Sequence, residues 1–154
     1  MKSTVVPFEP RHAPAWAALN LAWLEEGGFV VEAKDRRVID DPVGAILDAG
    51  GRIFMVEQDG AAVGCCALMA MPDGGFEVAK MTVTPAARGQ GLSRRLLEAC
   101  EAEARAAGAH RLYLESASSL TTAGALYRAF GFIDLPPRPT PYARADVFME
   151  KRLG

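Results

Sequence analysis

The residues best suited to chemistry lie in one glycine-rich turn, Arg88-Gly89-Gln90-Gly91-Leu92-Ser93. An apolar stretch from Met81 to Val83 leads toward this turn, and Pro85 interrupts it. Glycine lets the backbone approach a ligand closely and adopt positive φ angles. The turn also opens a segment with helical spacing, and the first amides of a helix have no intrahelical acceptor. Such amides bind phosphate groups, so we expect the turn to hold a pyrophosphate.

Two established phosphate-binding motifs do not fit this turn. The phosphate loop of nucleotide hydrolases has a Lys followed by Ser or Thr after its last glycine, whereas Gly91 precedes Leu92 and Ser93. The dinucleotide-binding fingerprint has a third Gly or Ala further along, where this chain has Arg94. A purely structural corner between a strand and a helix remains an alternative to phosphate binding.

The pattern that remains is Arg88-x-x-Gly91-x-Ser93, preceded by Val83-x-Pro85. It resembles motif A of the GNAT N-acetyltransferase superfamily, which reads Arg/Gln-x-x-Gly-x-Gly/Ala. Ser93 is the departure from that pattern, and it is small enough to allow close approach of a phosphate. The resemblance implies an N-acetyltransferase that uses acetyl-CoA as its co-substrate.

A second segment, residues 123–132, reads Ala-Gly-Ala-Leu-Tyr-Arg-Ala-Phe-Gly-Phe. It resembles the Ala-x-x-Leu-Tyr-x-x-x-Gly-Phe segment near the end of the same superfamily. Its spacing predicts a short helix that Thr121 or Thr122 caps and Gly131 ends. At Leu120, many members of the superfamily carry an Asn that contacts the pantetheine arm of the cofactor, so the chain departs from the pattern there.

Length and composition are those of one compact unit. The chain has 154 residues, 50% of them hydrophobic, and no evident linker, so we expect residues 1–154 to form a single domain, which the resemblance implies is an acetyltransferase domain. A net charge of −2 without any run of Lys or Arg argues against a nucleic-acid partner. A small molecule is therefore the expected substrate, and the resemblance implies that it is an amine.

Other partners and ligands are not expected. No stretch reaches the roughly 20 apolar residues of a membrane-spanning helix, which argues against a membrane partner. Met1–Thr4 leads into an expected strand and not into a signal peptide core, so we expect a cytoplasmic location. Cys65 and Cys66 are adjacent on an expected strand and should point to opposite faces as reduced thiols. His12 and His110 have no Cys or His at ligand spacing, so no metal site is expected.

Periodicity and turn residues predict the order strand, helices, three strands, helix, strand, helix, two strands. This order indicates an α/β fold with a mixed sheet, and Asp59-Gly60 is a strong hairpin signal. It is also the order of the GNAT fold, so the resemblance implies a three-layer sandwich: a central twisted sheet of about six to seven strands with about four helices. The expected strands are 4–8, 52–58, 61–71, 76–83, 111–116, 132–135 and 146–152, and the expected helices are 12–25, 42–49, 92–107 and one around Tyr127.

The resemblance also implies where the cofactor binds. The pantetheine arm would lie along the backbone of Met81, Thr82 and Val83, in a cleft where the central parallel strands splay apart. Core packing is the alternative role for the Met81 and Val83 side chains. Arg88 would add positive charge near the pyrophosphate. The pyrophosphate itself would meet the amides of Gly89, Gln90, Gly91, Leu92 and Ser93.

Two residues are expected to carry the catalysis. Tyr127 matches the superfamily tyrosine that protonates the departing thiolate; a tyrosine of pKa about 10 is a reasonable donor to a thiolate whose acid has a pKa of about 8.5. Its alternative roles are to orient the cofactor or to pack. Glu77, a carboxylate among apolar residues, is the expected general base, because burial would raise its pKa. A solvated strand end, or an ion pair with Lys80, is the other interpretation of Glu77, and the rival bases are Glu115 and a bound water.

Acceptor recognition should fall to the N-terminal helices and the last hairpin loop. Trp16, Trp23 and Phe29 could line an acceptor pocket or seal the core. Arginines could hold the carboxylate of an amino acid, and carboxylates could attract a polyamine or aminoglycoside, with surface solvation as the alternative for both sets. The arginines are Arg36, Arg37 and Arg144, and the carboxylates are Glu25, Glu26, Glu32 and Asp35.

Residues 77–81, 114–116 and 141–150 resemble one bacterial branch of the superfamily, usually described as acting on small amines or amino acids. We therefore expect transfer of an acetyl group from acetyl-CoA to the primary amine of a small molecule by direct nucleophilic attack. The alternatives are a sensor that binds acyl-CoA without catalysis, a structural domain that retains the fold, and a protein or peptide N-acetyltransferase. Pairing of the terminal strands between two copies could give a homodimer.

Overall fold

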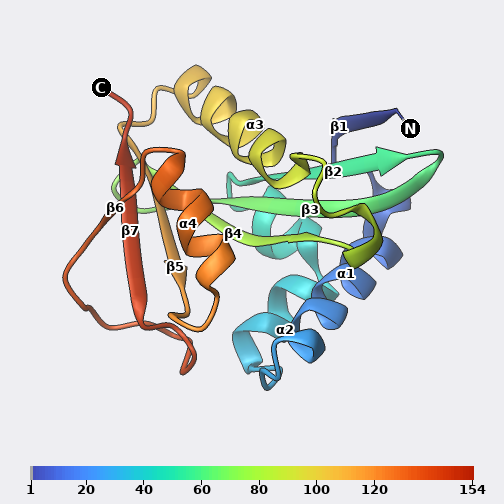
Figure 1. Ribbon diagram of the computed structural model, residues 1–154. Helices are drawn as coiled ribbons and strands as arrows, with labels where there is room; N and C mark the ends of the chain where they lie inside the picture. Colours follow the sequence, from blue (N-terminus) through green and yellow to red (C-terminus); the bar gives the residue numbers. More distant parts are fainter. Residues whose placement is uncertain (1) are drawn as a thin grey trace.

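One mixed β-sheet runs through the computed structural model, which describes residues 2–154 (Figure 1). Its strands lie in the order β1-β2-β3-β4-β5-β7-β6, and β4 and β5 are the parallel pair. The predicted mixed α/β sheet of six to seven strands is confirmed. The strands are β1 (Ser3–Pro7), β2 (Arg52–Gln58), β3 (Ala61–Ala70), β4 (Phe76–Val83), β5 (Arg111–Ser116), β6 (Ile133–Asp134) and β7 (Val147–Arg152).

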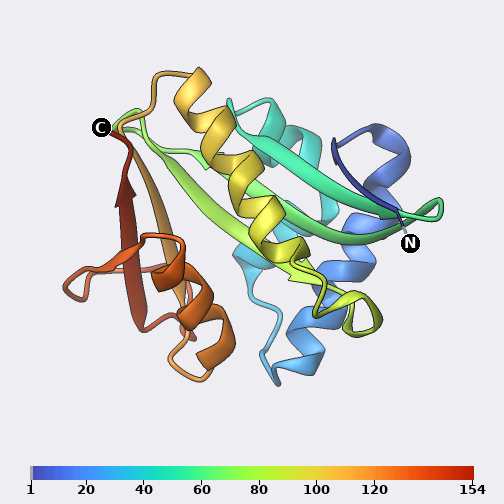
Figure 2. The same ribbon diagram turned by 45° about the horizontal axis from the view of Figure 1, so that its top comes forward.

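Helices cover both faces of the sheet and complete a three-layer arrangement. Figure 2 shows α3 lying across one face, with α1 and α2 on the other. Short turns also connect these elements, a π-helical one at Val43–Leu47 and two 3₁₀ turns at Pro10–His12 and Pro85–Ala87. The α-helices are α1 (Ala13–Glu26), α2 (Ala33–Asp40), α3 (Leu92–Ala106) and α4 (Thr121–Ala129).

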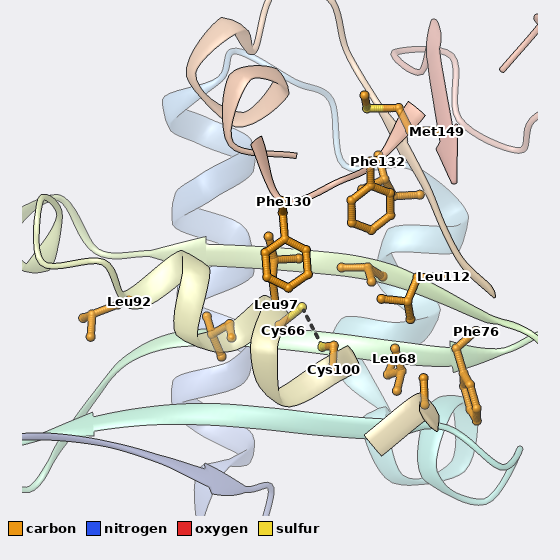
Figure 3. Close-up of a cluster of buried hydrophobic side chains, with 14 of the residues drawn as sticks. Cys66, Leu68, Phe76, Leu92, Leu97, Cys100, Leu112, Phe130, Phe132 and Met149 are labelled. Carbon is orange, nitrogen blue, oxygen red and sulfur yellow. Dashed lines mark hydrogen bonds between the residues drawn. The ribbon is translucent and has the colours of Figure 1, made fainter. Parts of the chain in front are cut away.

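Each face of the sheet has its own hydrophobic core. Figure 3 shows the core on the α3 side, where Leu97 and Cys100 of the helix meet Cys66 and Leu68 of β3. Cys65, next along the strand, belongs to the core on the α1 and α2 side. The prediction that these adjacent cysteines point to opposite faces is confirmed, and all three cysteines are buried free thiols. The Sγ atoms of Cys66 and Cys100 lie 3.7 Å apart.

The hairpin between β2 and β3 turns where the sequence predicts. Asp59 and Gly60 have φ angles of 51° and 82°, so both central residues are left-handed. Two such residues match the right-handed twist of the flanking strands, which is why Asp-Gly favours this turn. The pairing of Gln58 with Ala61 closes the hairpin.

Strand β4 contains a bulge that matters for the site. Cys65 of β3 pairs with Thr82 and Ala67 pairs with Ala79, so β4 has one residue more than β3 over this stretch. Lys80 lies in the bulge with a φ of 54°, an unusual angle for a residue other than glycine. On the opposite edge, β4 pairs with β5 only along Phe76–Val78. Beyond Val78 the two parallel strands separate.

Three local expectations differ from the structure. The helix at Ala33–Asp40 was not predicted, because its apolar Val38 and Ile39 follow a charged run too short to show helical periodicity. The helical piece expected at 42–49 is a π-helical turn at Val43–Leu47. Helix α4 begins at Thr121 without any side-chain capping hydrogen bond, so the predicted threonine cap is wrong. Across residues 2–154, none of the helices combines the length and the apolar character needed to cross a bilayer.

Candidate active site

The divergence of β4 from β5 opens a cleft. It is lined by both strands, by α1 and α4, and by the loop between β6 and β7. The lining residues that bear on chemistry are Asn20, Trp23, Glu77, Lys80, Met81, Thr82, Glu115, Leu120, Tyr127, Tyr142 and Arg144.

The cradle, Arg88–Ser93, follows β4 and opens α3. Gly89 and Gly91 have φ angles of 80° and 73°, a region that favours glycine. Apart from its chain neighbours, a Cβ atom built at either glycine would meet no protein atom within 4 Å. The two glycines are therefore needed for the backbone conformation and leave open space beside the turn, and they do not relieve a packing clash. Gly91 is the N-cap of α3 and offers no side chain to cap it, and the first amide bonded within the helix is that of Arg95. The preceding amides are therefore available to an anion, as a pyrophosphate requires.

The side chains of the cradle are more occupied than its backbone. Both carboxylate oxygens of Glu26 accept hydrogen bonds from the guanidinium of Arg88, at 2.7 and 2.6 Å. The Nε of Arg88 also donates to the carbonyl of Val83 at 3.0 Å. Hence the charge expected to serve a pyrophosphate is paired with the end of α1. Gln90 accepts a hydrogen bond from the side chain of Gln58, and Leu92 is buried, so Leu92 can offer only its amide. Ser93 is half-buried in the first turn of α3.

Met81, Thr82 and Val83 lie on β4 beyond its pairing with β5. Met81 and Thr82 line the cleft, whereas the Val83 side chain is buried in the core beneath α3. The structure therefore gives Val83 the packing role that the sequence left open. The edge of β4 next to the cleft has no strand partner over these residues.

Tyr127 reaches the cleft from α4, and its ring packs edge-on against Phe132 with centroids 6.0 Å apart. Burial, with a smaller effect of Cys66, raises the pKa of Tyr127 above that of tyrosine in water. Its hydroxyl therefore stays protonated at ordinary pH and is available as a hydrogen-bond donor. Because Cys66 belongs to the core beneath α3, Tyr127 approaches the cleft from that side of the sheet.

Glu77 approaches the cleft from the other side. It pairs in register with Met69, which packs in the core beneath α1 and α2. Burial, and then the nearby charge of Glu115, raise the pKa of Glu77 from 4.5 to about 7, while Lys34 and Lys80 oppose the rise. A carboxyl group with this pKa can accept a proton near neutral pH.

Glu115 lies on the neighbouring strand and is held in place. It accepts a hydrogen bond from the hydroxyl of Tyr113 at 2.8 Å and another from the hydroxyl of Thr140. Glu77 is opposite Tyr113 in the ladder, and Glu115 is two residues further along on the same face. The expected base and its rival therefore lie side by side in one cleft.

Lys80 does not pair with Glu77, because its ammonium donates to Asp35 of α2. The two side chains are 5% and 0% exposed. Arg144 of the β6–β7 loop donates to both oxygens of Asp35, at 2.9 and 2.7 Å, and also to Glu32 at 3.3 Å. Burial would raise the pKa of Asp35, but the hydrogen bonds from Arg144 and Lys80 outweigh it and lower that pKa to about 2. This ion cluster of Glu32, Asp35, Lys80 and Arg144 joins α2, β4 and the last loop beside the cleft.

The sequence did not predict that cluster. It singled out Asp35, Glu32 and Arg144 as separate candidates for binding an acceptor, and the fold instead makes them bind each other. A signal was nevertheless present, since Glu32 and Asp35 form a capping box at the start of α2. That local pattern would have placed Asp35 on the first turn of a helix.

The other acceptor candidates separate into core, cleft and surface. Trp16 is fully buried, with its Nε1 donating to the carbonyl of Val38, so it packs in the core. Trp23 lines the cleft, and Phe29 packs against it with ring centroids 5.3 Å apart. Arg36 is exposed and pairs with Asp40. Arg37 and Glu25 are also exposed.

No group of three or more His, Cys, Asp and Glu side chains is arranged to hold a metal ion within residues 2–154. The candidate site consists instead of a backbone cradle for an anion, a tyrosine donor and a carboxyl group of raised pKa. These are parts suited to moving protons around a phosphate-bearing co-substrate.

Comparison with known proteins agrees with this class of site. The sequence model of the acetyltransferase (GNAT) family matches residues 6–132. The chain therefore belongs to the GNAT acetyltransferase family, and it is an acyltransferase.

Individual relatives support the same class. An IAA acetyltransferase of Azospirillum brasilense is 44% identical over 107 residues, which are 66% of this chain and 68% of that protein. An amino-acid acetyltransferase of Azotobacter vinelandii is 34% identical over 131 residues, 84% of this chain but only 27% of that longer protein. In fold, the chain resembles the yncA protein of Salmonella typhimurium, whose structure contains its cofactor acetyl-CoA: the TM-score is 0.80 at 22% identity, over 100% of this chain and 95% of that one.

Proposed function

We propose that this chain transfers the acetyl group of acetyl-CoA to the primary amine of a small molecule by direct attack of the amine on the thioester. Residues 1–154 would act together as one such domain. The observation that carries the proposal is the cleft between β4 and β5, which Glu77 and Tyr127 enter from opposite faces of the sheet. The base must reach the acceptor nitrogen and the acid must reach the thioester sulfur, so the reaction needs two separately placed groups. The Azotobacter relative is named for amino acids, which supports a small molecule over a protein as the acceptor.

The cofactor fits the residues present. The uncapped amides at the start of α3 would hold the pyrophosphate, and Gly89 and Gly91 leave room for it. The unpaired edge of β4 at Met81 and Val83 would hydrogen-bond the pantetheine arm. Bound in this way, acetyl-CoA would supply the thioester.

In the proposed reaction, residues of the chain transfer protons while one bond forms and one breaks. Glu77 accepts a proton from the ammonium of the acceptor and so produces the neutral amine. The amine nitrogen forms a bond to the carbonyl carbon, and the carbon–sulfur bond breaks. Tyr127 donates its proton to the departing sulfur and recovers one from water, while the amide nitrogen and Glu77 release their protons to water.

Arg88 would change partners in this scheme. In the structure its guanidinium is paired with Glu26 at the end of α1. Both side chains are nearly half exposed, so exchanging Glu26 for a phosphate oxygen requires little free energy.

Calorimetric titration with acetyl-CoA, followed in the same sample by thiol release against amines, amino acids and short peptides, tests the proposal. Binding with release from small amines supports it. Binding without release from any acceptor would instead indicate a sensor, and release from peptides alone would indicate a protein N-acetyltransferase. Absence of binding would contradict the placement of the cradle. Propionyl-CoA and longer acyl-CoAs, run in parallel, measure the preference for the acyl group.

A further inference from the structure

The charged groups of the cleft narrow the acceptor class, an inference that rests on the proposed function. We propose that the acceptor is a small primary amine with no carboxylate on the carbon next to its nitrogen. The cleft receives an ammonium group and repels an α-carboxylate. Free α-amino acids acetylated at their α-nitrogen are thereby excluded.

The first observation is the pair of carboxyl groups at the acceptor side. Glu77 and Glu115 project from neighbouring strands onto one face, and each lines the cleft. Glu115 is fixed by the hydroxyls of Tyr113 and Thr140. An ammonium group next to Glu77 is attracted by both carboxylates, whereas an α-carboxylate two bonds away from it meets two like charges.

The second observation is that the cations lining the cleft are already neutralised. Lys80 and Arg144 are the two basic residues among its lining residues. Both bind the fully buried Asp35, and Arg144 also binds Glu32. With two cations matched by two carboxylates, this cluster presents no net positive charge to a substrate carboxylate. Breaking it would leave buried charges unpaired, which is strongly unfavourable.

The remaining nearby cations lie outside the lining. Lys34 is 5.6 Å from the ring centroid of Tyr142, and Arg138 is 5.7 Å from that of Tyr113. Lys34 is near enough to Glu77 to oppose the rise of its pKa and so offsets part of the repulsion, but it is not among the residues that line the cleft.

The body of the acceptor would lie against aromatic rings. Trp23 from α1 and Tyr142 from the last loop line the same side of the cleft, with Arg144 between them at 5.7 and 4.4 Å from the two ring centroids. Flat faces of this kind suit an apolar or aromatic group. Arylalkylamines and alkylamines therefore fit better than strongly polar acceptors.

Matched acceptor sets test the proposal. Each set has an amine, the amino acid that adds an α-carboxylate to it, and the amino-acid amide, which has nearly the same size without the charge. Suitable sets are phenethylamine, phenylalanine and phenylalaninamide, and 3-methylbutylamine, leucine and leucinamide. The kcat/KM values measured by thiol release should be about tenfold to a hundredfold higher for the amine and the amide than for the amino acid. This is the effect expected of one uncompensated contact between like charges.

Variants of the ion cluster should shift this ratio. Asp35→Asn removes the charge that neutralises Lys80 and Arg144, so the kcat/KM of phenylalanine relative to phenethylamine should rise about tenfold. Asp40→Asn is the matched control, because Asp40 is on the same helix but pairs with Arg36 at the surface, and it should leave the ratio unchanged. If Asp35→Asn does not fold, Glu32→Gln is the substitute, because Glu32 is partly exposed and also pairs with Arg144. Removing the Glu32 charge leaves Arg144 less completely neutralised and should shift the ratio in the same direction.

The outcomes separate this inference from the proposed function. Equal or faster use of the amino acids overturns the inference and leaves the acetyltransferase proposal standing. Amides as poor as the amino acids also overturn it, since size and not charge would then be responsible. Failure of every set, with acetyl-CoA bound, contradicts the proposed function and this inference with it.

Discussion

Replacing Glu77 by Gln should make the protein more stable at alkaline pH while it slows acetyl transfer. The pKa of Glu77 rises from 4.5 to about 7 in the folded chain, first because it is buried and then because Glu115 is near. At about 1.36 kcal/mol for each tenfold change in the proton equilibrium, this rise corresponds to roughly 3 kcal/mol. The figure is an upper limit, because Glu77 keeps some contact with solvent. An effect of about 1–2 kcal/mol is expected.

The sign follows from proton linkage. Below pH 4.5 the carboxyl group is protonated in both the folded and the unfolded chain, so Glu and Gln should be equally stable. Between pH 4.5 and about 7 the unfolded chain releases its proton first, and the folded protein loses stability as pH rises. Above about pH 7 the whole penalty of a buried charge is present in the wild type and absent from Glu77→Gln.

Urea unfolding of both proteins at pH 4.5, 6, 7 and 8.5 measures the difference, with Glu98→Gln on the exposed face of α3 as the control. In parallel, kcat/KM of the wild type should increase with pH through an apparent pKa near 7, and this limb should disappear from the variant. A difference in stability that is constant with pH would refute the assignment of a raised pKa to Glu77. A stability difference of the expected form with an unchanged rate profile would refute only its role as the base.

Three further changes test other parts of the structure. Tyr127→Phe should lower turnover about tenfold to a thousandfold with unchanged acetyl-CoA affinity by calorimetry, and an unchanged rate would assign Tyr127 to packing. Gly91→Val should abolish acetyl-CoA binding while circular dichroism stays native, because a φ of 73° disfavours a branched side chain and that side chain would fill the open space left for the phosphate. Normal binding would place the cofactor elsewhere. Asp35→Ala should lower the free energy of unfolding by about 3–5 kcal/mol, because Lys80 and Arg144 would lose a buried partner. The exposed pair of Asp40 should contribute less than about 1 kcal/mol by the same urea assay.

Local patterns in the sequence predicted much of the fold. The hairpin strands, the Asp59-Gly60 turn and the helix after Gly91 were predicted within a residue or so, because each is specified by neighbours in the chain. Helix α2 was missed, since Val38 and Ile39 are its main apolar residues and only the fold shows what they pack against.

The candidate site was predicted less completely than the fold. Motif resemblance located the cradle and Tyr127, but the ion cluster depends on residues from three distant segments that meet around Asp35. No spacing along the chain encodes that meeting. For the same reason, the sequence suggested Lys80 as a partner for Glu77 and Arg144 as a receptor for a substrate carboxylate.

The bulge in β4 changes whether even-numbered or odd-numbered residues of the strand face α3. Phe76 and Val78 are buried in the core beneath α3, and after the bulge the residues that join them are Val83 and, partly, Met81. The strand therefore switches from even to odd positions at Lys80. Deleting one residue between Val78 and Val83 would remove the bulge, restore unbroken alternation and leave Val83 on the α3 side. A regular strand of the present length, without the bulge, would instead turn Val83 to the opposite layer. The bulge at Lys80 is therefore what allows a strand of this length to keep both Val78 and Val83 in the core beneath α3.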